Sequence, residues 1–210
     1  MTDYQTSEGK LFKEVLGNKW KDLHIDIQTR FDKNPSPDSP LKYEGIIDEL
    51  YCSGWGKVLA YITKPMIKGA LIPYSENDVP VDIRVYTLNN DPNIYKERIY
   101  KLKNKKPLLF TSNMRLSTNG EVLEYVGMGL GMKLTITEKD SNLHFESDGY
   151  FLDIGFFRIP IPALFTPGKT FLQHVNEGPE CFSIRIEIIH SILGRTFLQT
   201  GIFNDKEKSI

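Results

Sequence analysis

The chain has 210 residues, of which 40% are hydrophobic and 25% charged, a balance that favours a sizeable buried core over a disordered chain. Its 26 basic and 27 acidic residues give a formal net charge of −1, which argues against a surface built to neutralise the phosphates of nucleic acid. The opening segment has no basic start followed by an apolar run, and no stretch approaches the roughly 20 apolar residues of a membrane span, so we expect a cytoplasmic protein.

Two short helices are predicted near the N-terminus. The first ends at Gly17, where a helix often needs a glycine cap, and its apolar residues recur at helical spacing: Leu11, Phe12, Val15 and Leu16. The second is expected to run from Asn18 as its N-cap to about Arg30, with one apolar face formed by Trp20, Leu23 and Ile27. Three prolines within residues 34–40 then break the helix and predict a surface loop.

From Tyr43 onward the sequence predicts β-strands, with one short helix at about Gly56–Lys64. Alternation of apolar and polar residues is clearest along residues 81–87 and 182–188, and turn signals recur between such runs. We therefore predict an α+β, mainly β fold: a curved antiparallel sheet or partial barrel with two short N-terminal helices and one further short helix. Residues 1–210 are expected to form a single domain, with its core at about 8–203 and a frayed tail at 204–210.

No pattern in the chain matches a known catalytic loop, phosphate-binding loop or metal-binding helix. The two cysteines, Cys52 and Cys181, lack the paired spacing of a zinc site and are interpreted as reduced thiols near the core. Alternating glycines at 127, 129 and 131 favour close backbone packing over phosphate binding, because no helix pattern follows them. We therefore expect neither a bound metal nor a cofactor.

Four polar side chains are candidates to converge on a ligand: His24, Arg30, Arg98 and His190. His190 is in phase with the apolar residues of the strand at 182–188 and should therefore face the interior, where a histidine needs a hydrogen-bond partner. This position suits either a structural core histidine or a catalytic base. Arg98 follows Glu97 on a strand, and adjacent strand residues point to opposite faces, so at most one of the two faces inward.

The segment Tyr150–Phe171 is richer in aromatic and branched residues than one half-buried strand requires. Its three prolines exclude a regular central strand, so part of it must be an edge strand or a loop. Such a loop either closes the open end of a sheet or remains exposed for a partner or ligand. Phe156 and Phe157 are adjacent, so we expect only one of them to face a ligand.

Short motifs follow one another in a characteristic order from about Leu11 to Phe203. They are L-F-K-E-V-L-G near the start, L-H-I-D-I-Q-T-R-F at Leu23–Phe31, D-V-P-V-D-I at Asp78–Ile83, Glu97-Arg98 followed by Phe110 and Met114, E-Y-V-G at Glu124–Gly127, I-P-I-P at Ile159–Pro162, and I-L-G-R-T-F-L-Q-T-G-I-F at the end. In this order they resemble a bacterial family, domain of unknown function 4166, which occurs alone or fused to saccharopine-dehydrogenase-like or membrane segments. The family has no established activity, so the resemblance implies domain boundaries and an intracellular setting rather than a mechanism.

Three functions are compatible with these residues. The leading hypothesis is binding of an apolar or amphipathic small molecule in a β-cup, with ligand contacts from His24, Arg30, Arg98, Phe156, Phe157 and His190. The alternative is a protein-interaction module that docks through Phe156–Phe165 onto an oxidoreductase or a membrane partner. The third is an enzyme that uses His190 with Glu97 or Glu124. A pocket, a flat exposed patch and a perturbed acid or base in a cleft would distinguish the three.

Overall fold

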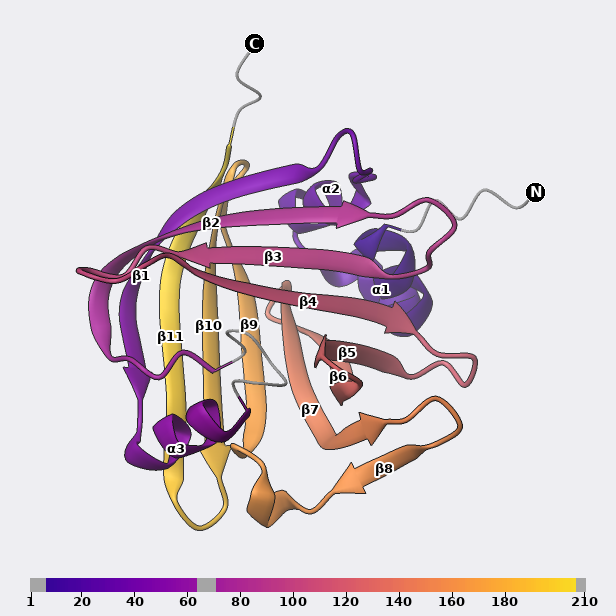
Figure 1. Cartoon of the computed structure of the whole chain (residues 1–210). Helices are drawn as coiled ribbons and strands as arrows, with labels where there is room; N and C mark the ends of the chain where they lie inside the picture. The colour runs from indigo at the N-terminus through magenta and orange to yellow at the C-terminus, as the bar shows by residue number, and fades with distance from the viewer. Residues whose placement is uncertain (1–6, 64–70, 207–210) are drawn as a thin grey trace.

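The structure of the protein is a computed structural model in which residues 7–63 and 71–206 are described. Figure 1 shows a bundle of long, curved strands with helices at its two ends. The elements, in chain order, are α1 (Glu8–Leu16), the 3-10 helix η1 (Gly17–Asp22), α2 (Ile25–Asp32), β1 (Leu41–Cys52), α3 (Gly54–Thr63), β2 (Glu76–Thr87), β3 (Ile94–Tyr100), β4 (Leu108–Leu116), β5 (Val122–Gly127), β6 (Leu130–Lys139), β7 (Asn142–Asp153), β8 (Arg158–Ile161), the 3-10 helix η2 (Ala163–Phe165), β9 (Lys169–Gly178), β10 (Cys181–His190) and β11 (Gly194–Asp205).

Ten of these strands close into an antiparallel barrel. Strands β1 to β6 pair in sequence order, and the other half of the ring runs from β7 through β9, β10 and β11 back to β1. Pairing of β6 with β7, from Leu130 opposite Leu152 to Lys139 opposite Asn142, completes the ring. Closure satisfies the backbone hydrogen bonds that an open sheet leaves free at its edges. The predicted mainly β fold with a curved sheet or partial barrel is confirmed, and the pairings of the ten strands form a closed ring.

Strand β7 changes its partner along its length. Its first part, Leu143–Glu146, pairs with β9, whereas its last part, Tyr150–Asp153, pairs with the short strand β8. In Figure 1, β7 bends away from β9 at the lower end of the barrel, and β8 continues outside the ring. The barrel wall is therefore interrupted between the lower parts of β7 and β9.

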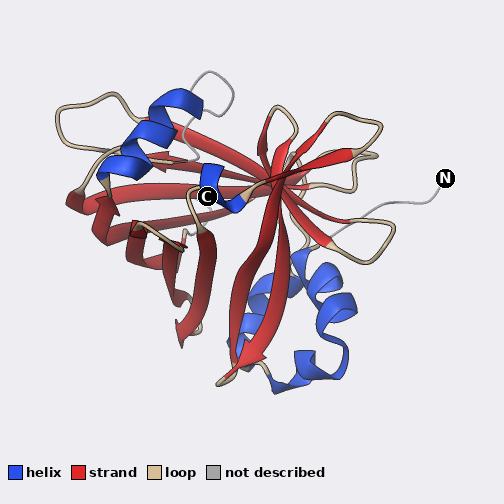
Figure 2. Ribbon diagram, turned by 90° about the horizontal axis from the view of Figure 1, so that it is seen from below, coloured by secondary structure: helices blue, strands red, loops and turns tan. Residues whose placement is uncertain are grey.

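The N-terminal helices cover the opposite end of the barrel. The ring of Phe12 in α1 lies 5.6 Å from the ring of Phe145 in β7, and the backbone N–H of His24 donates to the carbonyl oxygen of Ser141 in the β6–β7 turn. Figure 1 shows α1 and α2 at the upper right and α3 at the lower end, and Figure 2 shows the N-terminal helices and α3 on opposite sides of the strands. The upper end is thus closed by side chains of α1 and α2.

The first predicted helix is confirmed, and the second is only partly right. Helix α1 ends at Gly17, whose φ of 53° suits a glycine cap. The predicted N-cap at Asn18 is wrong, because residues 17–22 form the 3-10 helix η1 and Leu23 is extended. Helix α2 begins after His24, whose Nδ1 accepts from the backbone N–H of Asp26. The hydrogen bond from His24 to the barrel requires this break, and sequence spacing carries no signal of that tertiary contact.

The remaining predicted elements fit the structure closely. The prolines at 34–40 lie in a loop, and α3 at Gly54–Thr63 confirms the third helix up to the last described residue of that segment. The tail prediction needs correction at its start: β11 continues to Asp205, whose N–H donates to the carbonyl oxygen of Glu180. Residues 207–210 lie outside the described part of the chain. Within the described part, no helix has the length and apolar character needed to cross a membrane.

Candidate functional site

The barrel encloses a cavity of about 580 Å³. A barrel widens as strands are added, and about eight strands already leave an interior that side chains just fill or that holds one small ligand. Ten strands therefore leave space that the inward side chains of this chain do not fill. The volume lies within the range of about 300–1,000 Å³ that is typical of ligand pockets.

Most of the cavity wall is apolar. The inward row of β10 contributes Phe182, Ile184, Ile186 and Ile188, as its alternation in sequence predicts. Ile184 and Ile186 are only half-buried, because their side chains border the cavity instead of packing against another layer. Similar half-buried apolar residues come from β4, β6 and the neighbouring strand β9: Phe110, Met132 and Leu172. The inward side chains of these strands therefore form the wall of a cavity in the barrel interior.

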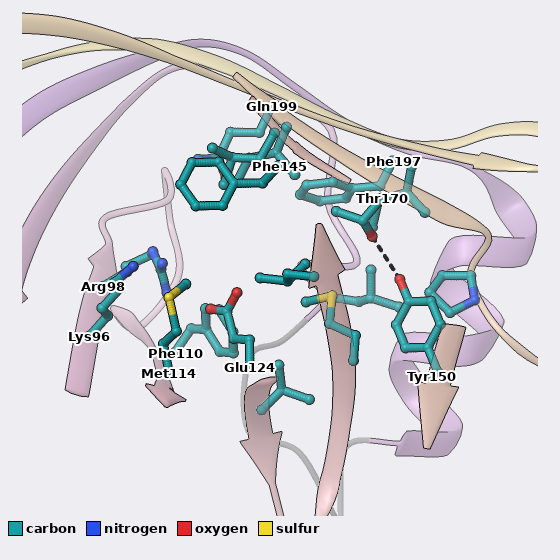
Figure 3. Close-up of a pocket in the computed structure, with 18 of the residues that line it drawn as sticks. Lys96, Arg98, Phe110, Met114, Glu124, Phe145, Tyr150, Thr170, Phe197 and Gln199 are labelled. Atoms are coloured by element: carbon teal, nitrogen blue, oxygen red, sulfur yellow. Dashed lines mark hydrogen bonds between the residues drawn. The ribbon is translucent and has the colours of Figure 1, made fainter. Parts of the chain in front are cut away.

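The cavity reaches the surface at the lower end, where β7 separates from β9. Its lining there includes Ile159–Pro162 of the β8 segment, Phe165 of η2, and Leu59 of α3. Phe165 is 66% exposed and Ile159 is 41% exposed, so these residues belong to both the cavity and the outer surface. A hydrogen bond of 2.7 Å between the hydroxyls of Tyr150 and Thr170 bridges β7 and β9 at this place (Figure 3).

A polar group of three residues lies on the β3–β5 part of the wall. Arg98 Nη1 donates to Ser112 Oγ at 3.1 Å, and Ser112 Oγ donates to Glu124 Oε1 at 2.8 Å. Ser112 is almost fully buried, which fixes the hydroxyl between the two charged groups. In Figure 3, Arg98 and Glu124 extend into the cavity on the side opposite Tyr150. The serine hydroxyl links the guanidinium to the carboxylate without direct contact between them.

Two further cations lie toward the helical end of the cavity. Lys96 Nζ is 2.6 Å from Glu8 Oε1, a largely buried ion pair that ties α1 to β3. The guanidinium of Arg30 lies 4.6 Å above the ring of Phe182, and its Nη2 donates to the carbonyl oxygens of Gly178 and Cys181. Arg30 Nη1 has no hydrogen-bond partner within the described residues. Both cations thus occupy an interior of low polarity, where charges interact strongly.

Three tyrosines carry buried hydroxyls on the cavity wall. Burial raises the pKa of Tyr150 to about 12, and burial also raises the pKa values of Tyr43 and Tyr100. The hydroxyl of Tyr100 donates to Gln199 Oε1 at 3.1 Å. These phenols remain protonated at neutral pH, so they act as hydrogen-bond donors and add no charge to the interior.

His174 is a buried, uncharged histidine at the helical end of the cavity. Its ring stacks on Phe182 with centroids 4.6 Å apart, and its Nδ1 has no hydrogen-bond partner in the described part of the chain. Burial, and then the positive charge of Arg30, lowers the pKa of His174 to about 3. The neutral imidazole is therefore a polar but uncharged part of the cavity wall near pH 7.

The depressed pKa of His174 predicts a loss of stability in mild acid. Between pH 6.5 and 3 the unfolded chain protonates this histidine and the folded chain does not, so the free energy of unfolding falls as the pH falls. We expect the loss between pH 7 and pH 5 to be smaller in His174→Gln by about 2 kcal/mol. Urea unfolding of both proteins at the two pH values measures this difference. Equal losses would show that His174 titrates normally in the folded protein.

The structure brings two of the four predicted polar residues to the cavity. Arg30 and Arg98 line it, whereas His24 and His190 are not among its lining residues. His24 is exposed and caps α2, where its Nδ1 also lies 3.1 Å from Asn176 Nδ2. His190 faces inward, as its phase in the strand predicts, but its Nδ1 accepts from the backbone N–H groups of Ile192 and Leu193. These two hydrogen bonds tie the imidazole of His190 to the backbone of the β10–β11 turn.

The aromatic pair lies on the outer surface. Phe156 is 95% exposed and Phe157 is 60% exposed, in the turn between β7 and β8, and neither lines the cavity. Strand alternation predicts that one of the two turns inward, but residues 154–157 form a turn instead of a strand, so the alternation rule does not apply. The Tyr150–Phe171 segment is therefore divided between a cavity-facing part and an exposed part.

Neither glutamate of the enzyme hypothesis contacts His190. Glu97 accepts a hydrogen bond from the hydroxyl of Tyr86, and Glu124 accepts from Ser112. Arg98 lines the cavity and Glu97 does not, which matches the expectation that at most one of the two faces inward. Within residues 7–63 and 71–206, no group of three or more histidine, cysteine, aspartate or glutamate side chains is placed to hold a metal ion.

Lys96, Ser112 and His174 were not recognised as site residues from the sequence. Each is in phase with apolar neighbours that face the interior: Lys96 with Ile94, Ser112 with Phe110 and Met114, and His174 with Leu172. A polar residue at an inward position of an alternating strand is the signal that could have identified them.

The family model described as Domain of unknown function (DUF4166) matches residues 23–203, which is most of the chain. No curated protein matches the chain.

Proposed function

The chain belongs to the family Domain of unknown function (DUF4166), and we propose that its barrel binds an apolar or amphipathic small molecule in the central cavity. The observation that carries the proposal is the apolar lining of a space of about 580 Å³. Protein interiors normally pack to near-crystalline density with few voids larger than a water molecule. Apolar side chains that border this cavity have no protein contacts across it, and a ligand of matching size would supply such contacts.

The polar groups of the wall support an amphipathic ligand. Pockets for small molecules are mostly apolar and contain a few polar groups that orient the ligand. Here the polar groups lie on two opposite sides of the cavity. One side has Arg98 and Glu124, the other has the hydrogen-bonded pair Tyr150 and Thr170, and apolar residues form the wall between them. The exposed lining residue Phe165 marks the place where a ligand would enter.

A neutral fluorescent probe, N-phenyl-1-naphthylamine, tests the proposal. We expect it to bind at micromolar concentration with a negative heat-capacity change, because binding buries apolar surface. Ile186→Trp places a large side chain in the cavity and should weaken probe binding by about tenfold or more, which corresponds to about 1.4 kcal/mol. Ile202→Trp is the matched control, because Ile202 is 46% exposed on β11 and does not line the cavity.

The second candidate function is docking onto a partner through the exposed apolar residues of the 154–165 segment. The observation that favours it is the exposure of Phe156, Phe157, Leu164 and Phe165. The same titration separates the two functions. Probe binding that is lost in Phe156→Asn or Phe157→Asn, and kept in Ile186→Trp, would place the probe on this patch and favour docking over a cavity ligand.

A further inference from the structure

The charged residues that line the cavity carry one positive charge in excess. Three of them are cations, Arg30, Lys96 and Arg98, and two are carboxylates, Glu8 and Glu124. Three positive and two negative charges leave one positive charge, since His174 is neutral near pH 7. Glu8 is matched by Lys96 at 2.6 Å. The interior therefore favours a ligand with a single negative charge.

The charges directly beside Arg30 do not remove this excess. The nearest carboxylate to Arg30 is Asp205, whose Oδ1 lies 3.8 Å from Arg30 Nε. Asp205 also pairs with Lys33, at 2.5 Å between Oδ2 and Nζ. The cations Arg30 and Lys33 together thus face one carboxylate. Arg30 and Lys96 also contribute, after burial, to the lowered pKa of His174, which indicates a positive field at this end of the cavity.

Arg98 is the cation best placed to contact a ligand. Its guanidinium donates one hydrogen bond, from Nη1 to Ser112, and forms no other hydrogen bond or ion pair with a described residue. A guanidinium has five N–H donors, so most of its capacity remains available. It lies 5.2 Å from the ring centre of Phe110, an apolar surface that reduces competition from water. Figure 3 shows it extending into the cavity beside Glu124.

We propose that the ligand is a monoanionic amphipath with one carboxylate, that the carboxylate pairs with Arg98, and that the apolar part extends toward Ile159–Pro162 at the opening. This inference rests on the proposed function and names the ligand class. A planar guanidinium matches a carboxylate with two parallel hydrogen bonds. Glu124, held on the same serine as Arg98, would repel a second negative charge and so disfavours a phosphate dianion.

Competition against the neutral probe tests the inference. Tetradecanoate and tetradecan-1-ol have the same chain and differ in the head group, so the ratio of their affinities reports the recognition of the carboxylate. We expect the wild-type protein to favour the acid, and Arg98→Met to lower the acid-to-alcohol ratio by about tenfold or more. Glu124→Gln should raise the ratio, because it removes the nearby negative charge. Arg84→Met is the matched control, since Arg84 lies on β2 outside the cavity lining and should leave the ratio unchanged.

The outcomes distinguish this inference from the proposal on which it rests. Opposite changes in Arg98→Met and Glu124→Gln support it, because general loosening of the barrel cannot move the ratio in both directions. A probe that binds, with an acid-to-alcohol ratio equal in wild type and Arg98→Met, overturns the carboxylate site and leaves the binding cavity standing. If calorimetry detects binding of neither the probe nor tetradecanoate to the wild-type protein, both are overturned.

Discussion

Replacing Phe12 by alanine should destabilise the protein by about 3–5 kcal/mol. Phe12 is fully buried in α1, and its ring makes edge contacts with Phe31 of α2 at 5.0 Å and with Phe145 of β7 at 5.6 Å. Truncation would leave a cavity where the two N-terminal helices meet the barrel. The cost therefore includes both the lost burial and the space left behind. Urea unfolding at pH 7 measures it.

Phe156→Ala is the matched control for this substitution. It removes the same side chain from a position that is 95% exposed, so the free energy of unfolding should change by no more than about 0.5 kcal/mol. Equal stabilities of Phe12→Ala and the wild type would mean that α1 is not packed on the barrel.

The second large effect is expected at Gly129 in the turn between β5 and β6. Gly129 has a φ of 78°, and a Cβ atom there would lie 2.2 Å from the carbonyl oxygen of Asp153. The backbone of β7 would have to move, and the hydrogen bond from the Asp153 N–H to the Gly129 carbonyl oxygen would be disturbed. We expect Gly129→Ala to cost about 2–5 kcal/mol, from the left-handed backbone and the overpacking together.

Gly120 provides a control with nearly the same backbone. Its φ is 76°, but a Cβ atom there meets no atom within 4 Å. Gly120→Ala should therefore cost only the conformational part, about 1–2 kcal/mol. Thermal unfolding of the two variants separates the terms. Similar losses would show that β7 does not approach Gly129 as closely as the structure indicates. The close approach also agrees with the packing interpretation of the alternating glycines.

The strands and the first helix could be predicted because their signals are local. Alternation along β2 and β10 marks which side chains face inward, and the glycine at 17 marks the end of α1. The closure of the barrel could not be predicted in the same way. It depends on the β6–β7 pairing and on the change of partner along β7, and neither has a composition of its own.

The cavity was harder to predict than the fold. Ile184 borders the cavity and Phe203 is fully packed, yet both are large apolar residues at inward positions of long strands. Sequence periodicity identifies the inward face, but it does not indicate whether another layer covers that face. The surplus of apolar residues in Tyr150–Phe171 did point to this end of the barrel. The division between lining and exposed residues arises because the chain leaves the barrel at Asp153.

The site was predicted only in part. Arg98 and Lys96 are both in phase with the inward row of β3, but only Arg98 was predicted, together with Arg30 on the inner face of α2. His190 is also in phase with an inward row, but the turn after β10 provides backbone donors to its imidazole. Such local hydrogen bonds depend on turn geometry that the phase of a strand does not reveal.

Methyl NMR of the protein with the neutral probe tests the binding cavity most directly. Isoleucine and leucine methyl groups occur both inside and outside the barrel, so the shifted signals locate the probe. We predict shifts and probe-to-methyl contacts at the inward residues Leu172, Ile184 and Ile186, and none at the outward residues Ile46, Ile99 and Ile202. Shifts confined to the exposed residues Leu164, Ile192 and Leu193, with the inward methyls unchanged, would contradict a ligand in the cavity.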